Sequence, residues 1–330
     1  MTLPRVFVTR QIPDIGLELL HPHAQVEVWP NSQPPSSDIL LEKIPHLHGL
    51  LCLLTDPINQ TLINAGTSLK VISQMAVGYD NIDVKAATRK NIPVGNTPGV
   101  LTDATADLTW ALLMGAARRI VEAQKFVHAG NWTTWEPMLL LGADVAGSTL
   151  GIVGLGRIGE AVARRARGFN MRIIYSSRQR KSPQLEQSLG LEYVDFETLL
   201  QESDFVTIHT ALSAETHHLF SDRAFCLMKK TAILINTARG SIVNQDALYQ
   251  ALKKGEIAAA ALDVTDPEPI PLDNPLLSLP NCLILPHIGS ASYKTRALMA
   301  KMAAKNLIAG LLEQKLPHCV NPEVYQHKLT

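Results

Sequence analysis

The sequence lacks most features of an extracellular, membrane-bound or nucleic-acid-binding protein. Its four cysteines, Cys52, Cys226, Cys282 and Cys319, show no paired spacing that suggests a disulfide framework or a zinc site. Thirty basic and thirty acidic side chains cancel, so the basic excess of a nucleic-acid binder is missing. No uncharged apolar run reaches the roughly 18 residues that cross a bilayer, and Val6–Val8 is too short for a signal-peptide core. We therefore expect a cytoplasmic protein with no nucleic-acid or membrane partner.

Short apolar segments alternate with helical patterns in two series along the chain. The expected strands are 5–9, 49–55, 69–73 and 92–94 in the first series, and 149–153, 172–175, 205–209, 232–236, 259–263 and 282–285 in the second. This alternation predicts parallel sheets with right-handed crossovers. The expected fold class is α/β, with two Rossmann-like or flavodoxin-like domains.

The last predicted helix, 292–314, is too long to complete the second series alone, so we expect it to return to the first. The first domain is then discontinuous and consists of residues 1–100 plus 288–330. The second domain spans 101–287 and includes a loop-rich segment at about 121–148.

A glycine-rich turn follows the first strand of the second series. Gly154 allows a tight turn, Gly156 lets the backbone approach a pyrophosphate, and Gly159 allows close packing of helix on strand. Arg157 and Ile158 lie between the last two glycines, where the helix N-terminus offers free N–H groups to phosphates. With a strand before it and a helix after it, this motif predicts a dinucleotide site rather than a chance glycine turn.

The residues after the next strand bear on the choice of dinucleotide. An NAD site normally places an acid there for the ribose 2′-hydroxyl, but this chain has Ser177, followed by Arg178, Arg180 and Lys181. A guanidinium can pair with a 2′-phosphate, which a carboxylate would repel. NADPH is therefore the preferred cofactor, with NADH possible. The alternative is a solvated basic turn.

Three further segments place reactive side chains just beyond predicted strands. Arg239 follows the strand that ends near 236, Glu268 follows the strand that ends near 263, and His287 follows the strand that ends near 285. In an open α/β sheet, ligands bind beyond the carboxyl ends of the strands. Each residue alone could be an exposed arginine, a turn acid or a satisfied histidine, but the ordered set indicates catalysis.

The chain resembles the D-isomer-specific 2-hydroxyacid dehydrogenases over essentially its whole length, and most of all the glyoxylate/hydroxypyruvate reductases. The motifs that carry the resemblance are Val77-Gly78-Tyr79-Asp80, Thr97-Pro98-Gly99-Val100-Leu101-Thr102, the glycine turn, Ala238-Arg239-Gly240, Asp263-Val264-Thr265-Asp266-Pro267-Glu268-Pro269 and Leu285-Pro286-His287-Ile288-Gly289-Ser290-Ala291. Thr265 replaces the phenylalanine that is common in the acidic motif. The resemblance implies that residues 1–100 with 288–330 bind substrate and that 121–148 is a dimerisation arm.

The resemblance also implies the roles of the three reactive side chains. Arg239 holds the substrate carboxylate or polarises the ketone oxygen, and it stabilises the charge that grows there. His287 gives a proton to the same oxygen, and histidine suits this task because it titrates near neutral pH. Glu268 pairs with His287 and orients its ring.

The remaining expected sites rest on the same resemblance. Backbone N–H groups of Val77 and Gly78 bind the substrate carboxylate, and Trp135 acts as a specificity residue or as an interface anchor. Further cofactor contacts are expected at Thr105, Thr237, Ala238, Asp263 and Gly289. Paired histidines such as 217–218 lack metal-ligand spacing, so no metal is expected.

We thus predict an NADPH-dependent reductase that converts glyoxylate to glycolate and hydroxypyruvate to D-glycerate, acting as a homodimer on a small 2-keto acid. The alternatives are a related dehydrogenase for D-lactate or a longer keto acid, and a non-catalytic dinucleotide-sensing protein of the corepressor type.

Overall fold

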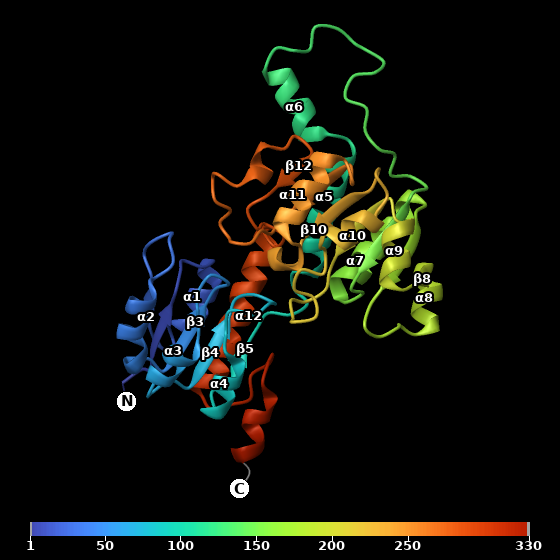
Figure 1. The fold of residues 1–330 in the computed structure, drawn as a ribbon. Coiled ribbons are helices and arrows are strands. Elements are labelled where there is room, and N and C mark those ends of the chain that lie inside the picture. The colour runs from blue at the N-terminus through green and yellow to red at the C-terminus, as the bar shows by residue number, and fades with distance from the viewer. Residues whose placement is uncertain (1, 329–330) are drawn as a thin grey trace. The chain divides into compact units, whose positions relative to one another are not determined.

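The computed structural model describes residues 2–328 and divides the chain into two units, each built on a parallel sheet (Figure 1). The first unit runs to Leu101 and resumes at Ala291, whereas the second is continuous from Thr102 to Ser290. The prediction of two α/β domains with parallel sheets, the first interrupted by the second, is confirmed.

The first unit is a five-stranded sheet in the order β2-β1-β3-β4-β5, which is the flavodoxin-like arrangement. Its elements are β1 (Arg5–Val8), α1 (Asp14–Leu20), β2 (Gln25–Val28), α2 (Ser37–Lys43), η1 (Ile44–His46), β3 (Gly49–Cys52), α3 (Gln60–Ala65), β4 (Val71–Gln74), α4 (Val84–Arg89), β5 (Val94–Gly95), α12 (Tyr293–Leu311) and η5 (Pro322–Lys328).

Alternate residues of each strand enter opposite cores of this unit, as the period of two requires. Val6 and Val8 pack with α1 and α12, whereas Phe7 packs with α2, α3 and α4. The long helix α12 therefore completes one of the two hydrophobic layers, as Figure 1 shows for the red helix behind the blue strands.

The second unit is a seven-stranded sheet in the order β12-β11-β10-β9-β6-β7-β8. Its elements are α5 (Thr102–Ala117), α6 (Ile120–His128), β6 (Thr149–Val153), α7 (Arg157–Ala166), η2 (Arg167–Phe169), β7 (Arg172–Ser176), α8 (Pro183–Leu189), β8 (Leu191–Tyr193), α9 (Phe196–Glu202), β9 (Phe205–Ile208), α10 (Asp222–Leu227), β10 (Ile233–Asn236), η3 (Gly240–Ile242), α11 (Gln245–Lys254), β11 (Ala259–Leu262), η4 (Pro275–Ser278) and β12 (Cys282–Ile284). The strand order reverses between β6 and β9, which is where a dinucleotide fold binds its ligand.

Two strands and one helix boundary differ from the sequence-based expectation. The edge strands β2 and β8 were not predicted, because each is short and half exposed and offers no continuous apolar run. Apolar residues at helical spacing in the sequence also predict one helix over 103–119, but α5 ends at Ala117, and Arg119 adopts a left-handed φ of 51° before α6 begins. All strands of each sheet run parallel, so the reactive residues that follow β10, β11 and β12 share one edge.

Candidate active site

His287 and Glu268 are joined at the carboxyl edge of the seven-stranded sheet. Nδ1 of His287 lies 2.8 Å from Oε2 of Glu268, and their side chains are 28% and 31% exposed. Glu268 comes from the loop after β11 and His287 from the loop after β12. Since Nδ1 is engaged, Nε2 is the ring nitrogen left to exchange a proton with a ligand.

The backbone at His287 adopts a left-handed conformation, with φ at 54°. Such a conformation is uncommon outside glycine, and it persists where the surrounding structure holds it in place. Asp263 supplies that hold. Its carbonyl accepts the N–H of His287 at 2.9 Å, and its carboxylate accepts the N–H groups of Ile288 and Gly289 at 2.7 Å each.

Asp263 is only 1% exposed, which raises the pKa of its carboxyl group, although the bonds from Ile288 and Gly289 act in the opposite direction. Asp263 is among the cofactor contacts that the resemblance implies, and the implied contact is with the nicotinamide carboxamide. The structure shows both carboxylate oxygens bonded to the histidine loop, so Asp263 positions His287. Its contact with a carboxamide stays a prediction.

Glu268 is fixed by the turn that carries it. The N–H of Thr265 donates to Oε1 of Glu268 at 3.1 Å, and the Thr265 hydroxyl donates to the carbonyl of Pro267 at 2.9 Å. Ser241 and Gln245 donate to Asp266 within the same turn. The carboxylate therefore presents Oε2 to the imidazole while Oε1 is held.

Arg239 follows β10 in a turn shaped by a buried asparagine. The Asn236 side chain accepts the N–H of Ala238 at 3.0 Å and donates to the carbonyl of Arg239 at 2.8 Å. Gly240 comes next, and any Cβ there would collide with the backbone of Thr265. Glycine thus allows the arginine turn to pack directly on the loop that carries Glu268.

The glycine turn after β6 has the geometry of a phosphate cradle. Gly154 has a φ of 91°, and a Cβ there would strike the backbone of the loop after β9. Gly156 caps α7 with no side-chain hydrogen bond and with open space around its Cβ position. Gly159 packs on the turn itself, Arg157 is exposed and Ile158 is half-buried. Free N–H groups at this helix terminus can therefore receive a pyrophosphate.

Several of the expected cofactor residues are neighbours. The Thr109 hydroxyl donates to the carbonyl of Thr105 at 2.8 Å and lies 3.0 Å from the hydroxyl of Thr237. A Cβ at Gly289 would lie 3.5 Å from Cγ2 of Thr105. The structure thus brings Thr105, Thr237, Gly289 and Asp263 together.

The loop after β7 holds the residues expected to select the dinucleotide. Ser177 is half-buried and donates to the carbonyl of Gln179 at 2.6 Å, and Arg178 is exposed. Arg180 was expected to contact the cofactor, but its guanidinium forms a two-bond pair with Glu186. Of these two arginines, only Arg178 makes no hydrogen bond or ion pair within residues 2–328.

Comparison with known proteins identifies the family. Residues 110–289 match the D-isomer specific 2-hydroxyacid dehydrogenase, NAD binding domain. A glyoxylate reductase of Korarchaeum cryptofilum is 53% identical over 322 residues, 97% of each chain. The chain belongs to the D-isomer-specific 2-hydroxyacid dehydrogenases. The resemblance noted in the sequence is confirmed.

Solved structures agree with this membership of the 2-hydroxyacid dehydrogenases. The TT0316 protein of Thermus thermophilus superposes with a TM-score of 0.90 at 45% identity, covering 96% of this chain and 99% of that one. An NADPH-dependent glyoxylate/hydroxypyruvate reductase of Sinorhizobium meliloti, in complex with NADP and malonate, gives 0.85 at 30% identity, with 97% and 98% covered. The family's NAD-binding domain and the open glycine cradle together indicate a nicotinamide dinucleotide cofactor.

The remaining expected substrate residues of this dehydrogenase lie elsewhere in the chain. Val77 and Gly78 follow β4 in the first unit, and their carbonyls accept from Asn96 at 2.9 Å and from Gln74 at 3.3 Å. Their own N–H groups make no hydrogen bond within the described part of the chain. They are therefore open to a ligand anion.

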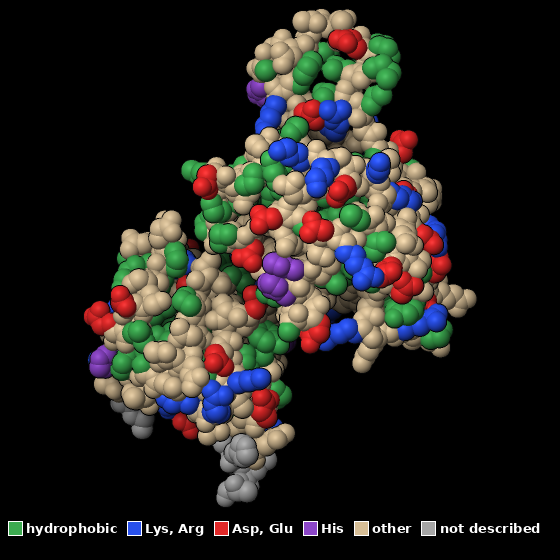
Figure 2. All heavy atoms as spheres, viewed as in Figure 1, with side chains coloured by type: hydrophobic (Ala, Val, Ile, Leu, Met, Phe, Trp, Pro, Cys, Tyr) green, Lys and Arg blue, Asp and Glu red, His purple; other side chains and the backbone are tan. Residues whose placement is uncertain are grey.

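Trp135 belongs to the predicted arm at about 121–148, whose helix α6 and following loop extend away from the rest of the second unit (Figure 1). Its side chain is 78% exposed, and that of Trp132 is 60% exposed. Hydrophobic side chains gather on this arm, which is the topmost part of Figure 2. The structure of the single chain does not bring Trp135 to the other site residues.

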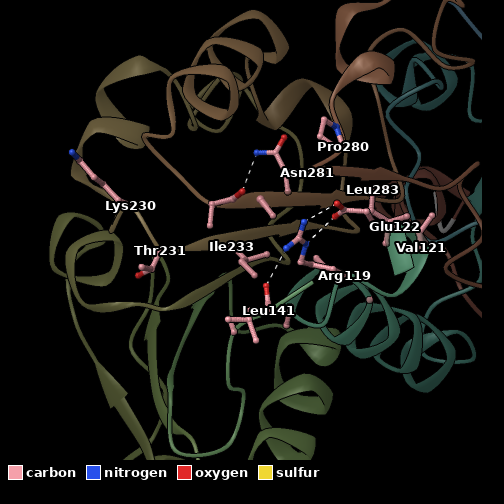
Figure 3. Close-up of a pocket in the computed structure, with 18 residues that line it drawn as sticks. Arg119, Val121, Glu122, Leu141, Lys230, Thr231, Ile233, Pro280, Asn281 and Leu283 are labelled. Atoms are coloured by element: carbon pink, nitrogen blue, oxygen red, sulfur yellow. Dashed lines mark hydrogen bonds and ion pairs between the residues drawn. The ribbon is translucent and has the colours of Figure 1, made fainter. Parts of the chain in front are cut away.

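A pocket of about 520 Å³ lies where the arm meets the sheet (Figure 3). Arg119 ties the arm together there, because it pairs with Glu122 at 2.7 Å and donates to the carbonyl of Leu141 at 3.2 Å. Ile233 and Asn281 place the pocket at the starts of β10 and β12. It is therefore at the sheet edge opposite His287.

Several residues of the site were missed by sequence reasoning. Thr265, Asn236 and Gly240 hold the loops that carry Arg239 and Glu268, and Asp263 holds the loop that carries His287, which the resemblance did not imply. A buried polar residue directly after a strand is the signal that could have found Asn236. Among residues 2–328, no helix is long and apolar enough to cross a membrane, and no cluster of three metal-ligating side chains occurs.

Proposed function

We propose that this dehydrogenase reduces glyoxylate and hydroxypyruvate with NADPH, and that His287 is the proton donor. The observation that carries the proposal is the 2.8 Å pair of His287 and Glu268 on the edge that follows β11 and β12. The names of the similar glyoxylate reductases support the choice of substrate.

A nicotinamide dinucleotide held at the glycine turn after β6 would supply the hydride for the carbonyl carbon of the keto acid. His287 donates the proton on Nε2 to the carbonyl oxygen and keeps a proton on Nδ1, bonded to Glu268. In the reverse direction the same nitrogen takes the proton from the hydroxyl group. The Glu268 carboxylate stabilises the charged imidazole through this bond.

Arg239 and backbone N–H groups bind the anionic parts of the substrate. The guanidinium of Arg239 has the fork of donors that suits a carboxylate or a developing oxyanion. We assign the substrate carboxylate to the unbonded N–H groups of Val77 and Gly78 as well. The left-handed backbone at His287 supports a functional role for this loop, because strained residues cluster at active sites.

The preference for NADPH rests on the loop after β7. No acid occupies the position of Ser177, and the exposed Arg178 can pair with a 2′-phosphate. The Sinorhizobium meliloti enzyme, named as NADPH-dependent, supports this assignment. NADH binds more weakly in this proposal, because it has no 2′-phosphate with which Arg178 could pair.

A rate comparison tests the proposed function. Steady-state reduction of glyoxylate, hydroxypyruvate, pyruvate and phenylpyruvate is measured with NADPH and with NADH. We expect the highest kcat/KM for glyoxylate and hydroxypyruvate, each with NADPH. A preference for phenylpyruvate would overturn the substrate assignment, and a preference for NADH would overturn the cofactor assignment.

We also propose a cytoplasmic homodimer that assembles through the arm. Exposed apolar side chains at Val127, Trp132, Trp135 and Met138 support this, because solvated apolar patches of this kind mark interfaces. All four cysteines are free, which suits a reducing compartment. Analytical ultracentrifugation of a Trp132→Ser/Trp135→Ser double variant is expected to show a monomer, and an unchanged mass would contradict the arm-mediated dimer.

A further inference from the structure

The basic run after β7 carries three cations, but acids of the same unit hold two of them. Nε and Nη2 of Arg180 each lie 2.9 Å from the Glu186 carboxylate. Lys181 reaches Glu160 of α7 at 3.0 Å. Arg178 makes no hydrogen bond or ion pair within residues 2–328, although its charge acts on Glu215, and it is the cation of the run that is available to a ligand phosphate. In this basic run Arg178 is therefore the candidate ligand contact, whereas Arg180 and Lys181 hold the loop in place as its two anchors.

Glu186 is the centre of the stronger anchor. Its side chain is 10% exposed, and besides Arg180 it accepts the hydroxyl of Tyr175 at 2.6 Å. Arg180, and after it Tyr175, lower the pKa of Glu186. The Tyr175 hydroxyl in turn accepts the N–H of Lys181 at 2.9 Å. Strand β7, the loop and helix α8 are thus joined through one buried carboxylate.

Two aromatic rings brace the same group. Tyr175 is fully buried in β7, and its ring packs edge-on against Tyr193 of β8 with centroids 5.3 Å apart. The guanidinium of Arg180 lies 5.7 Å from the Tyr193 centroid, within the range of a cation–π contact. Burial, and then the bond to Glu186, raise the pKa of Tyr175 to about 12, so its hydroxyl stays a donor at physiological pH.

We infer that Tyr175, Glu186 and Arg180 form a positioning cluster that sets how strongly this enzyme discriminates NADPH from NADH. The inference rests on the proposed pairing of Arg178 with the 2′-phosphate. The cluster fixes the chain at residues 180 and 181, and β7 fixes it at Ser176, so only Ser177, Arg178 and Gln179 remain between two held ends.

The physical basis is preorganisation. An arginine on a loop with fixed ends loses less conformational freedom when it binds a phosphate than one on a mobile loop. Arg180 also balances the negative charge of Glu186, because an unpaired carboxylate beside this loop would repel a 2′-phosphate bound there. Loosening the cluster therefore weakens ligands with a 2′-phosphate and leaves ligands without one nearly unaffected.

Binding of two adenosine nucleotides tests this directly. Adenosine 2′,5′-bisphosphate carries the 2′-phosphate and 5′-AMP lacks it, and their affinities are measured calorimetrically on the full chain. Tyr175→Phe removes the hydroxyl and keeps the ring. We expect the affinity for the bisphosphate to fall about fivefold, the cost of ordering a freed arginine, and that for 5′-AMP to change by less than about twofold.

Kinetics and a graded variant pair extend the test. In Tyr175→Phe the KM for NADPH is expected to rise by the same factor, with kcat and the KM for NADH unchanged. Arg180→Ala removes the ion-pair partner of Glu186 and should raise the ratio of the KM for NADPH to the KM for NADH further. Arg180→Lys should restore part of the wild-type ratio. Glu192→Gln is the matched control, because Glu192 pairs with Arg172 on the same two strands without touching the loop. Glu192→Gln should leave the ratio of the two KM values unchanged.

The outcomes separate this inference from the cofactor assignment. If Arg178→Ala weakens the bisphosphate selectively but Tyr175→Phe and Arg180→Ala do not, the cluster is only structural and the inference fails. Equal weakening of both nucleotides in Tyr175→Phe also overturns it. If Arg178→Ala itself has no selective effect, the proposed NADPH preference fails.

Discussion

The two sheets of this protein use their carboxyl edges differently. In the first unit, Asp56 lies beyond β3 and is fully buried, and it accepts the Thr9 hydroxyl and the N–H of Leu53 while pairing with Arg10 at 3.4 Å. In the second unit, His287 and Glu268 pair with each other and remain about a third exposed. At these two points the same parallel architecture gives a buried polar cluster in the first unit and accessible polar side chains in the second. The exposure of the side chains, rather than the fold, is what singles out His287 and Glu268 as the candidate catalytic pair.

The strongest test of this contrast removes the reactive histidine. His287→Ala is expected to lower kcat about 1,000-fold, because the developing alkoxide loses its proton donor. The dissociation constant for NADPH and the melting temperature should change little. His23→Ala, an exposed histidine of the first unit, serves as the control. Turnover that survives in His287→Ala would remove this residue from the mechanism.

The converse test targets a buried polar residue of the first unit. Asn321 accepts the N–H of Val94 at 2.8 Å and donates to Thr88 and Ile92 at 2.9 and 3.0 Å. Asn321→Ala should cost about 2–3 kcal/mol of the free energy of unfolding, because buried partners lose their bonds. Chemical denaturation measures this loss of stability, and we expect kcat to stay unchanged.

The exposed Asn31 provides the comparison for Asn321, and Asn31→Ala is expected to change neither stability nor rate. A large fall in kcat in folded Asn321→Ala would show that this buried network also affects the proposed reaction.

Acid should destabilise the second unit through His209. Burial lowers the pKa of His209 to about 3, and its Nε2 has no partner within residues 2–328. The unfolded chain takes up a proton near pH 6.5 and the folded chain does not, so stability falls as the pH drops from 6.5 towards 3. At pH 5 the loss is at most about 2 kcal/mol. Calorimetric melting of the wild type and His209→Asn checks this, and an equal pH dependence in both would contradict it.

The smallest expected effect concerns Thr265, whose hydroxyl holds the turn that carries Glu268. Thr265→Val keeps the shape and removes the bond to Pro267, so Glu268 orients His287 less well. We expect kcat to fall about threefold to tenfold, the worth of one hydrogen bond, with an altered pH profile of kcat/KM. Thr265→Ser should restore both, and a Thr265→Val enzyme with wild-type kinetics would show that the hydroxyl plays no positioning part.

Much of the fold was predictable from buried strands and the glycine turn, because apolar runs and special backbone positions are local signals. The central strands β6, β9 and β10 have such runs, whereas the edge strands β2 and β8 do not. A short edge strand has no such local signal, so it can be identified only from its pairing with a neighbouring strand in the structure.

The site was predictable in position but not in its hydrogen bonding. That reactive residues follow β10, β11 and β12 could be inferred, since parallel strands end at a common edge. The bonds from Asp263 to the histidine loop and the ion pair of Glu186 with Arg180 could not be inferred. They join side chains that the fold brings together from separate segments. No spacing in the sequence encodes those pairings.

The interruption of the first unit by the second has a consequence for biosynthesis. The layer under β1 and β4 needs Met299, Ala303 and Leu307 of α12, which the ribosome makes only after residues 102–290. At 5–20 residues per second this delay is roughly 10–40 s. The dinucleotide unit is contiguous and can fold as it emerges, whereas the N-terminal strands wait for their last helix. During that interval the side chains of β1 and β4 that pack on α12 lack their partner helix.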